Sequence, residues 1–379
     1  MKKLICLSIL VLLILICPLA VSAEDDVGEI AAEIGQDISE LQEGVPDSAN
    51  EILAENGITP SDTEAMTSVM PEDIFSYIWS EVKAKAAYPL KVFAAVIAVI
   101  MLSSLVEALE DSASDKKLTR IYGVICVLVA VTVISTPVSE TIKTAATSLG
   151  NGGIFMAGYI PIFAGITASS GQITGAASYS VIVVFASNIA VTVATNYMIP
   201  ILSVCMALGI IEAINPNFSL TGITGAIQKA TQMVVSFAMV IFLGLLSTQT
   251  IIGASADTLG VRAAKFAASN FIPVVGSAVA DAYTTVKASL GLLRGGVGFF
   301  GIAAIFVMII PPLVEVGLMR LAFSAAEIAS DVFGTKSVKI LLSNTVKILS
   351  LVFSIMICFS VMLIISTAVV MMVGLNTVT

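Results

Sequence analysis

The stretch PLKVFAAVIAVIMLSSLVEAL (residues 89–109) carries no charged residue between Lys91 and Glu107. Its length matches the roughly 20 apolar residues that an α-helix needs to cross a bilayer. The whole chain is 57% hydrophobic and only 12% charged, whereas average soluble domains carry about 25% charged residues. The mean hydropathy is +1.02. The sequence therefore predicts an all-α, polytopic membrane helix bundle.

Further apolar runs continue to the end of the chain. They cover residues 121–139, 152–175, 178–214, 232–255, 266–293, 295–318 and 347–373. We expect Pro200 to interrupt the run 178–214, and Pro311-Pro312 to break the run 295–318, because proline removes a backbone donor. This predicts six or seven spans and two ambiguous segments, within a membrane domain at 89–373 that is followed by a tail at 374–379.

The N-terminus has the three parts of a secretory signal peptide. Met1-Lys2-Lys3 is basic, Leu4 to Ile16 is apolar, and Val21-Ser22-Ala23 supplies small residues. We predict a signal peptide at 1–23 with cleavage after Ala23. The alternatives are an uncleaved anchor helix and, with weaker support, a lipoprotein site at Cys17.

An acidic segment follows at 24–88, with sixteen Asp/Glu and no Lys/Arg from Glu24 to Glu81. An apolar stripe at helical spacing runs from Val27 to Val45 and predicts an amphipathic helix that ends at Gly44 and Pro46. The stripe needs a partner or the membrane face, unless this part is a frayed acidic tail. We expect Pro71 to start a second, interfacial helix, since the only Trp lies there and aromatic residues prefer the headgroup layer.

Prolines in the apolar runs suggest an internal repeat. Pro89, Pro200 and Pro311 are evenly spaced, which predicts units at 89–199 and 200–310 and a partial unit at 311–373. In this repeat the segments around Ile160-Pro161 and Ile272-Pro273 correspond. We expect Pro161 to Gly165 and Pro273 to Gly276 to be matching broken or re-entrant segments, the arrangement that forms the binding site in many transporters.

Charges in or near the apolar runs are candidate functional groups, because burying them is costly. Asp281 and Glu315 are the candidates for a polar pathway, whereas we interpret Glu107 and Glu212 as reaching the interface. The regions 256–295 and 319–347 are both basic loops, although a single crossing separates them. Either Pro311-Pro312 marks a reversal of the chain, or one of the two regions is re-entrant.

Several classes of function are excluded by what the chain lacks. Histidine is absent, which removes His-based triads, HExxH metal sites and imidazole relays. Cys126, Cys205 and Cys358 have neither metal-ligand nor redox spacing. Gly296–Gly301 matches GxGxxG, but no strand precedes it, so these glycines predict close helix packing. We predict no enzyme, no catalytic residue, no metal and no cofactor, and the acidic segment argues against nucleic acid as a partner.

Three motifs give the chain a resemblance to a known family. They are Tyr159-Ile-Pro with Ala168-Ser-Ser-Gly, the segment Asp257-Thr-Leu-Gly-Val-Arg-Ala-Ala-Lys265, and Phe271-Ile-Pro-Val-Val-Gly-Ser-Ala-Val-Ala-Asp-Ala282. Together with the leader and the acidic segment, they resemble the stage III sporulation protein AE family of endospore-forming bacteria.

The resemblance implies an integral membrane subunit of the channel that links mother cell and forespore and supports forespore development. It implies a place in the mother-cell membrane around the forespore, with the acidic segment extracytoplasmic. The implied partners are the lipid bilayer and other proteins of the same operon, including a cytoplasmic ATPase and ring-forming proteins between the membranes. The alternatives are a stand-alone secondary transporter with its site at the paired Ile-Pro segments, and a scaffold that only organises the complex.

Overall fold

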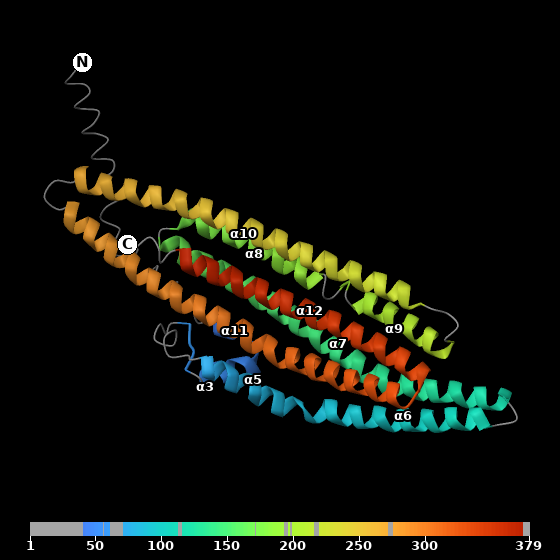
Figure 1. Ribbon diagram of the computed structural model, residues 1–379. Coiled ribbons are helices and arrows are strands. Elements are labelled where there is room, and N and C mark those ends of the chain that lie inside the picture. The colour runs from blue at the N-terminus through green and yellow to red at the C-terminus, as the bar shows by residue number, and fades with distance from the viewer. Residues whose placement is uncertain are drawn as a thin grey trace, which may run out of the picture.

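The computed structural model describes residues 41–55, 57–60, 71–112, 116–170, 172–192, 196–197, 199–215, 220–271 and 276–373. Within these ranges 94% of the residues are helical and none lies in a strand, which confirms the all-α class. Long helices lie side by side in an elongated bundle (Figure 1). The predicted signal peptide at 1–23 and the tail at 374–379 fall outside the described residues, so both stay predictions.

The described helices follow one another with short connections. In chain order they are α3 (Asp47–Glu55), α5 (Pro71–Lys85), α6 (Ala87–Ser112), α7 (Lys116–Ser169), α8 (Ile173–Thr192), α9 (Ile199–Ile214), α10 (Thr221–Phe271), α11 (Gly276–Val332) and α12 (Lys336–Val373). Five of them, namely α6, α7, α10, α11 and α12, are long and apolar enough to cross a membrane. The described part of the chain is therefore a multi-pass helix bundle.

Several predicted runs merge into single helices. The runs at 121–139 and 152–175 share α7, which has 54 residues, and α11 has 57. At 1.5 Å per residue each of these helices is about 80 Å long, whereas the hydrocarbon core of a bilayer is about 30 Å thick. Both helices therefore extend well beyond a single bilayer core, and the described part of the chain holds five candidate spans where the sequence predicts six or seven.

Proline interrupts these helices less often than we expect from the sequence. The helix continues through Pro161 in α7 and through Pro311 and Pro312 in α11, so a broken segment at Pro161 and a chain reversal at Pro311-Pro312 are both wrong. Each proline removes only one internal hydrogen bond, and packed neighbours can supply a substitute donor. The expected interruption near Pro200 is confirmed, because α8 ends at Thr192 and this proline is the second residue of α9.

The two basic regions are mostly helical and not loops. Residues 256–271 form the end of α10 and residues 276–295 the start of α11, whereas residues 319–347 form the end of α11, a short turn and the start of α12. The three prolines of the predicted repeat stand at different places in their helices. Pro89 and Pro200 stand near the starts of α6 and α9, whereas Pro311 lies deep inside α11. The repeat stays a prediction.

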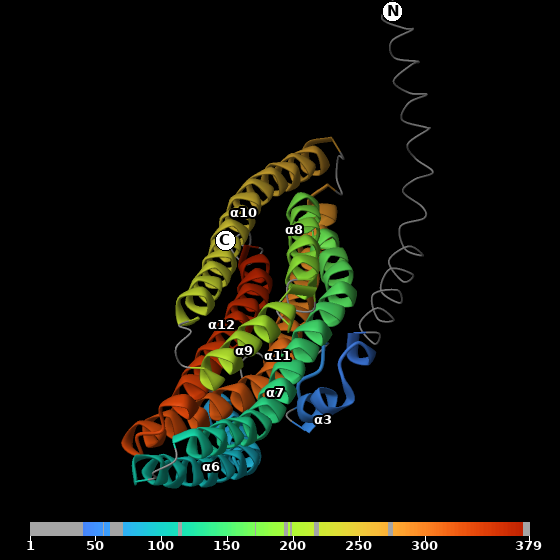
Figure 2. The same ribbon diagram turned by 90° about the vertical axis from the view of Figure 1, so that its right-hand side faces the viewer.

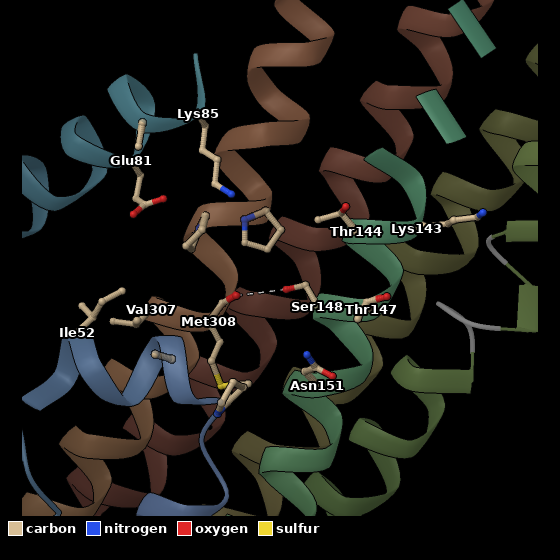
Figure 3. A pocket seen from close by; sticks show the side chains of 15 residues that line it. Ile52, Glu81, Lys85, Lys143, Thr144, Thr147, Ser148, Asn151, Val307 and Met308 are labelled. Atoms are coloured by element: carbon tan, nitrogen blue, oxygen red, sulfur yellow. Dashed lines mark hydrogen bonds between the residues drawn. The ribbon is translucent and has the colours of Figure 1, made fainter. Parts of the chain in front are cut away.

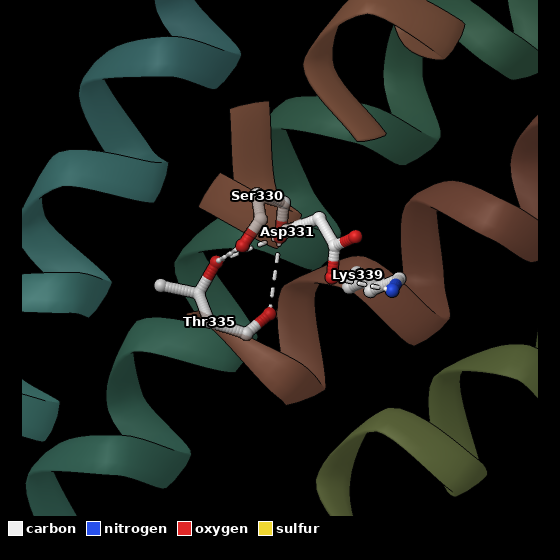
Figure 4. Close-up of polar contacts among 4 residues, drawn as sticks. All are labelled: Ser330, Asp331, Thr335 and Lys339. Carbon is white, nitrogen blue, oxygen red and sulfur yellow. Dashed lines mark hydrogen bonds and ion pairs between the residues drawn. The ribbon is translucent and has the colours of Figure 1, made fainter. Parts of the chain in front are cut away.

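The turn between α11 and α12 is fixed by its own side chains (Figure 4). Gly334 adopts a φ of 76°, a conformation that glycine reaches without steric cost. The Ser330 and Thr335 hydroxyls are 2.7 Å apart, and each is bonded to the other residue's carbonyl. Lys339 forms an exposed ion pair with Asp331 at 2.5 Å. This turn makes α11 and α12 antiparallel neighbours, and the buried face of α12 fills the middle of the bundle.

In the acidic segment at 24–88, helices α3 and α5 pack on the flank of the bundle. The helix that carries Leu41 ends before Gly44, as predicted, and Leu41 and Val45 are buried. Residues 24–40 lie outside the described residues. Pro71 begins α5, with Glu72 in its first turn, also as predicted. Both α3 and α5 lie against α11, and Figure 2 shows α3 on the outer side of the bundle beside α7.

Candidate functional site

A cavity of ≈ 660 Å³ lies where α3 and α5 meet the middle of α7 and α11 (Figure 3). Its apolar wall consists of Pro46, Ala49, Ile52, Ala84, Val307, Met308, Pro311 and Pro312. Its polar wall consists of Glu81, Lys85, Lys143, Thr144, Thr147, Ser148 and Asn151. The volume falls in the range of pockets that hold small ligands. The cavity thus lies between the acidic segment and the long apolar helices.

The polar wall comes from the sequence of α7. Two apolar runs in this helix are separated by residues 140–151, ETIKTAATSLGN, which contain one acid, one base and a series of hydroxyl and amide side chains. A helix brings residues three and four positions apart to one face. Thr144, Thr147, Ser148 and Asn151 consequently line the cavity together.

The double proline of α11 forms the opposite wall and is stabilised by α7. Pro312 has no N–H, so it cannot donate to the carbonyl of Met308 four residues earlier. The Ser148 hydroxyl donates to that carbonyl instead, at 3.3 Å, and Ser148 is buried. This bond replaces the helix hydrogen bond that Pro312 cannot make. The prolines can be read from the sequence, but nothing in the sequence pattern predicts that Ser148 donates this hydrogen bond.

Charged groups surround the cavity mouth. Lys85 at the end of α5 lies 3.7 Å from a carboxylate oxygen of Glu315, whose side chain is 19% exposed. The Tyr88 hydroxyl donates to Glu140 at 2.7 Å. Glu315, which we predicted for a polar pathway, therefore has a basic partner, Lys85, that lines the cavity. Partly exposed ion pairs of this kind contribute little to stability, about 0–1 kcal/mol.

The ring of Tyr77 anchors α5 on the membrane bundle. Its centroid lies 6.1 Å from that of Phe306 on α11. Burial, with a smaller contribution from the Glu81 carboxylate, raises the pKa of Tyr77 to about 12. The phenol is therefore neutral at physiological pH, which suits a side chain packed against an apolar helix.

The structure does not test the predicted site at the paired Ile-Pro segments. Pro161 and Gly165 are exposed on the unbroken helix α7, and no atom lies within 4 Å of a Cβ built on Gly165. Neither residue lines the cavity, and their role in binding stays a prediction. Pro273 lies outside the described residues, and Gly276 is the first residue of α11. Asp281 belongs to α11, but its side chain is not described, so its place in a polar pathway stays a prediction.

Sequence reasoning missed a buried arginine. Arg294, which we assigned to a basic loop, is 2% exposed inside α11. Its Nη1 donates to the Gln172 side chain at 2.7 Å, and its Nη2 donates to the Met371 carbonyl at 2.6 Å. That carbonyl belongs to the last turn of α12, where helix carbonyls lack internal partners and carry partial negative charge. Arg294 thereby ties α11 to α12 and to the α7–α8 connection.

The glycines of the GxGxxG match are packing residues, as predicted. A Cβ on Gly301 would overlap the ring of Tyr159, and one on Gly298 would lie 3.0 Å from Met371. Tyr159 also donates a hydrogen bond of 3.2 Å to the Val297 carbonyl. The motif therefore lets α7 approach α11 closely. No group of three or more His, Cys, Asp or Glu side chains gathers in the described part of the chain.

This architecture defines a class: a multi-pass helical membrane protein in which α3 and α5 pack on the long apolar helices, beside a cavity with one polar and one apolar wall. Within that class, the chain belongs to the stage III sporulation protein AE family, whose family model matches residues 52–374. It is 26% identical over 250 residues to the Stage III sporulation protein AE of Bacillus subtilis (strain 168). The match covers 66% of this chain and 61% of that relative, so the chain spans about three fifths of the relative's length. No solved structure matches.

Proposed function

We propose that the protein is an integral membrane subunit of the channel complex that links mother cell and forespore, and that forespore development requires it. Membership of the stage III sporulation protein AE family carries this proposal. In the proposed arrangement the chain sits in the mother-cell membrane around the forespore, with its acidic segment extracytoplasmic. Other proteins of the same operon, including a cytoplasmic ATPase and ring-forming proteins between the membranes, are its partners. We propose no catalytic role.

The packing of α3 and α5 supports a docking role for the exported segment. Leu53 of α3 is buried in the shared core, and Lys85 of α5 pairs with Glu315 of α11. An extracytoplasmic partner that binds this segment would therefore be coupled directly to the membrane helices at the cavity. The unbroken course of α7 through Pro161 removes the observation that favoured a stand-alone transporter.

Genetic complementation tests the proposal. In an endospore-forming host that lacks its own copy, we expect sporulation to stop during forespore development and the gene for this chain to restore it. Tagged protein should co-purify with the other operon products. Normal yields of heat-resistant spores without the gene would contradict the proposal. Solute flux through liposomes that contain only this chain would instead favour the transporter.

A matched pair of substitutions tests the docking role. Leu53→Asp places a charge in the core where α3 packs, so we expect it to detach α3 and to abolish complementation while the protein still accumulates in the membrane. Glu51→Gln changes an exposed charge on the same helix and serves as the control. Equal spore yields from the two variants would show that α3 packing is dispensable.

A further inference from the structure

Large apolar side chains on one side of α5 are exposed in the structure. Phe75 is 70% exposed and Trp79, one helical turn later, is 52% exposed; Ile74 beside them is also exposed. The sequence places Phe75 and Trp79 on the apolar face of an interfacial helix. In the structure Tyr77 makes the aromatic contact with the bundle, and Phe75 and Trp79 point outward.

The chain runs from α5 almost directly into a helix that can span the membrane. Only Ala86 separates α5 from α6, which is apolar enough to cross from Ala87 to Ala108. Tyr88 and Leu90, at the start of α6, are exposed as well. Because α6 enters the bilayer one residue after α5 ends, α5 lies close to the membrane surface.

The polar neighbours of Trp79 also suit the boundary between water and lipid. The Lys83 ammonium lies over the Trp79 ring, 5.6 Å from its centroid. A lysine stem can lie along apolar surface while its charge stays hydrated. Glu72 and Asp73 are exposed at the other end of α5, where they can remain in water. Tryptophan is enriched at the headgroup level because its ring is apolar and its N–H is polar.

We propose that the outward face of α5, formed by Ile74, Phe75 and Trp79, lies in the phospholipid headgroup layer and anchors the exported segment to the membrane. The partner is the lipid surface itself. Contact with lipid fixes the position of α5 and therefore of Glu81 and Lys85, which line the cavity from the same helix. This inference is independent of the role of the protein in sporulation.

The protein contains its own probe, because Trp79 is the only tryptophan in the chain. The full chain is reconstituted in phosphatidylcholine–phosphatidylglycerol vesicles. Part of the phosphatidylcholine is brominated either near the carbonyl end or near the methyl end of its acyl chains. We expect bromine near the carbonyl end to lower the emission about two-fold, as for a tryptophan at headgroup level. Bromine near the methyl end should quench clearly less.

A matched variant calibrates the depth scale. Trp79→Phe combined with Phe237→Trp moves the single tryptophan to an exposed position on the apolar stretch of α10. That tryptophan should be quenched more strongly by bromine near the methyl end. If Trp79 responds to neither bromolipid while aqueous acrylamide quenches it, the face is open to water or to a protein partner and the proposal is wrong. Stronger quenching of Trp79 by the deep bromine would equally overturn a headgroup position.

Discussion

Replacement of Gly301 by alanine tests the close contact between α7 and α11. The added Cβ would lie 2.5 Å from the Tyr159 hydroxyl oxygen and 2.6 Å from ring atom Cε2, and closer still to Cζ. The ring has little freedom to move away. It is stacked between Phe155 and Phe163, with centroids 5.5 and 5.3 Å away, and its hydroxyl is bonded to the carbonyl of Val297.

The size of the effect follows from these contacts. Forcing an extra methyl group into a packed core costs about 1–3 kcal/mol. If the ring moves enough to lose its hydrogen bond, the buried Val297 carbonyl loses a partner, which adds about 1 kcal/mol. The higher helix propensity of alanine returns up to about 1 kcal/mol. We therefore expect Gly301→Ala to destabilise the protein by about 1–3 kcal/mol, despite being the smallest substitution available.

The assay is thermal stability in detergent, followed by size-exclusion chromatography of heated samples. At about 2–4 °C per kcal/mol, the unfolding midpoint should fall by several degrees. Gly291→Ala on the same helix is the control, because no atom lies within 4 Å of its added Cβ. The double variant Gly301→Ala, Tyr159→Ala should lose less than the two single effects combined, since the smaller residue at 159 removes the overlap. An unchanged midpoint for Gly301→Ala would refute the close approach of the two helices.

Four further substitutions or measurements follow from the structure. Ser148→Ala should cost about 1–3 kcal/mol of stability by leaving a buried carbonyl without its donor, measured as the same midpoint. Arg294→Gln should cost about 2–5 kcal/mol because two buried acceptors lose a charged donor, whereas Arg320→Gln, at an exposed position, should change little. Gly165→Leu should support normal spore formation and change stability by less than about 1 kcal/mol. Gly165 is exposed, and no atom lies within 4 Å of its added Cβ. A block in sporulation would instead support the predicted site at this position. Intact mass of the membrane-extracted protein should show a mature chain that begins at Glu24, and a chain that still begins at Met1 would show an uncleaved anchor.

The sequence predicts well those helices and turns that depend on residues close together in the chain. Long uncharged runs form apolar helices, because burying backbone polar groups in lipid requires internal hydrogen bonds. Pro71 and Pro200 stand at the beginnings of α5 and α9, where the missing N–H has no cost. Gly334 ends the turn after α11 because glycine accepts a positive φ. The family itself follows from motifs that can be read directly in the chain, and the family model confirms it.

The tertiary structure decided which prolines break a helix and where the site lies. Pro312 is tolerated because Ser148, 160 positions away from Met308, supplies the missing donor. Arg294 is buried because its partners, 122 and 77 positions away, meet at the ends of other helices. The cavity likewise exists only where four helices meet. A residue's neighbours in sequence determine its helix, whereas its burial and its hydrogen-bond partners depend on helices that only folding brings beside it.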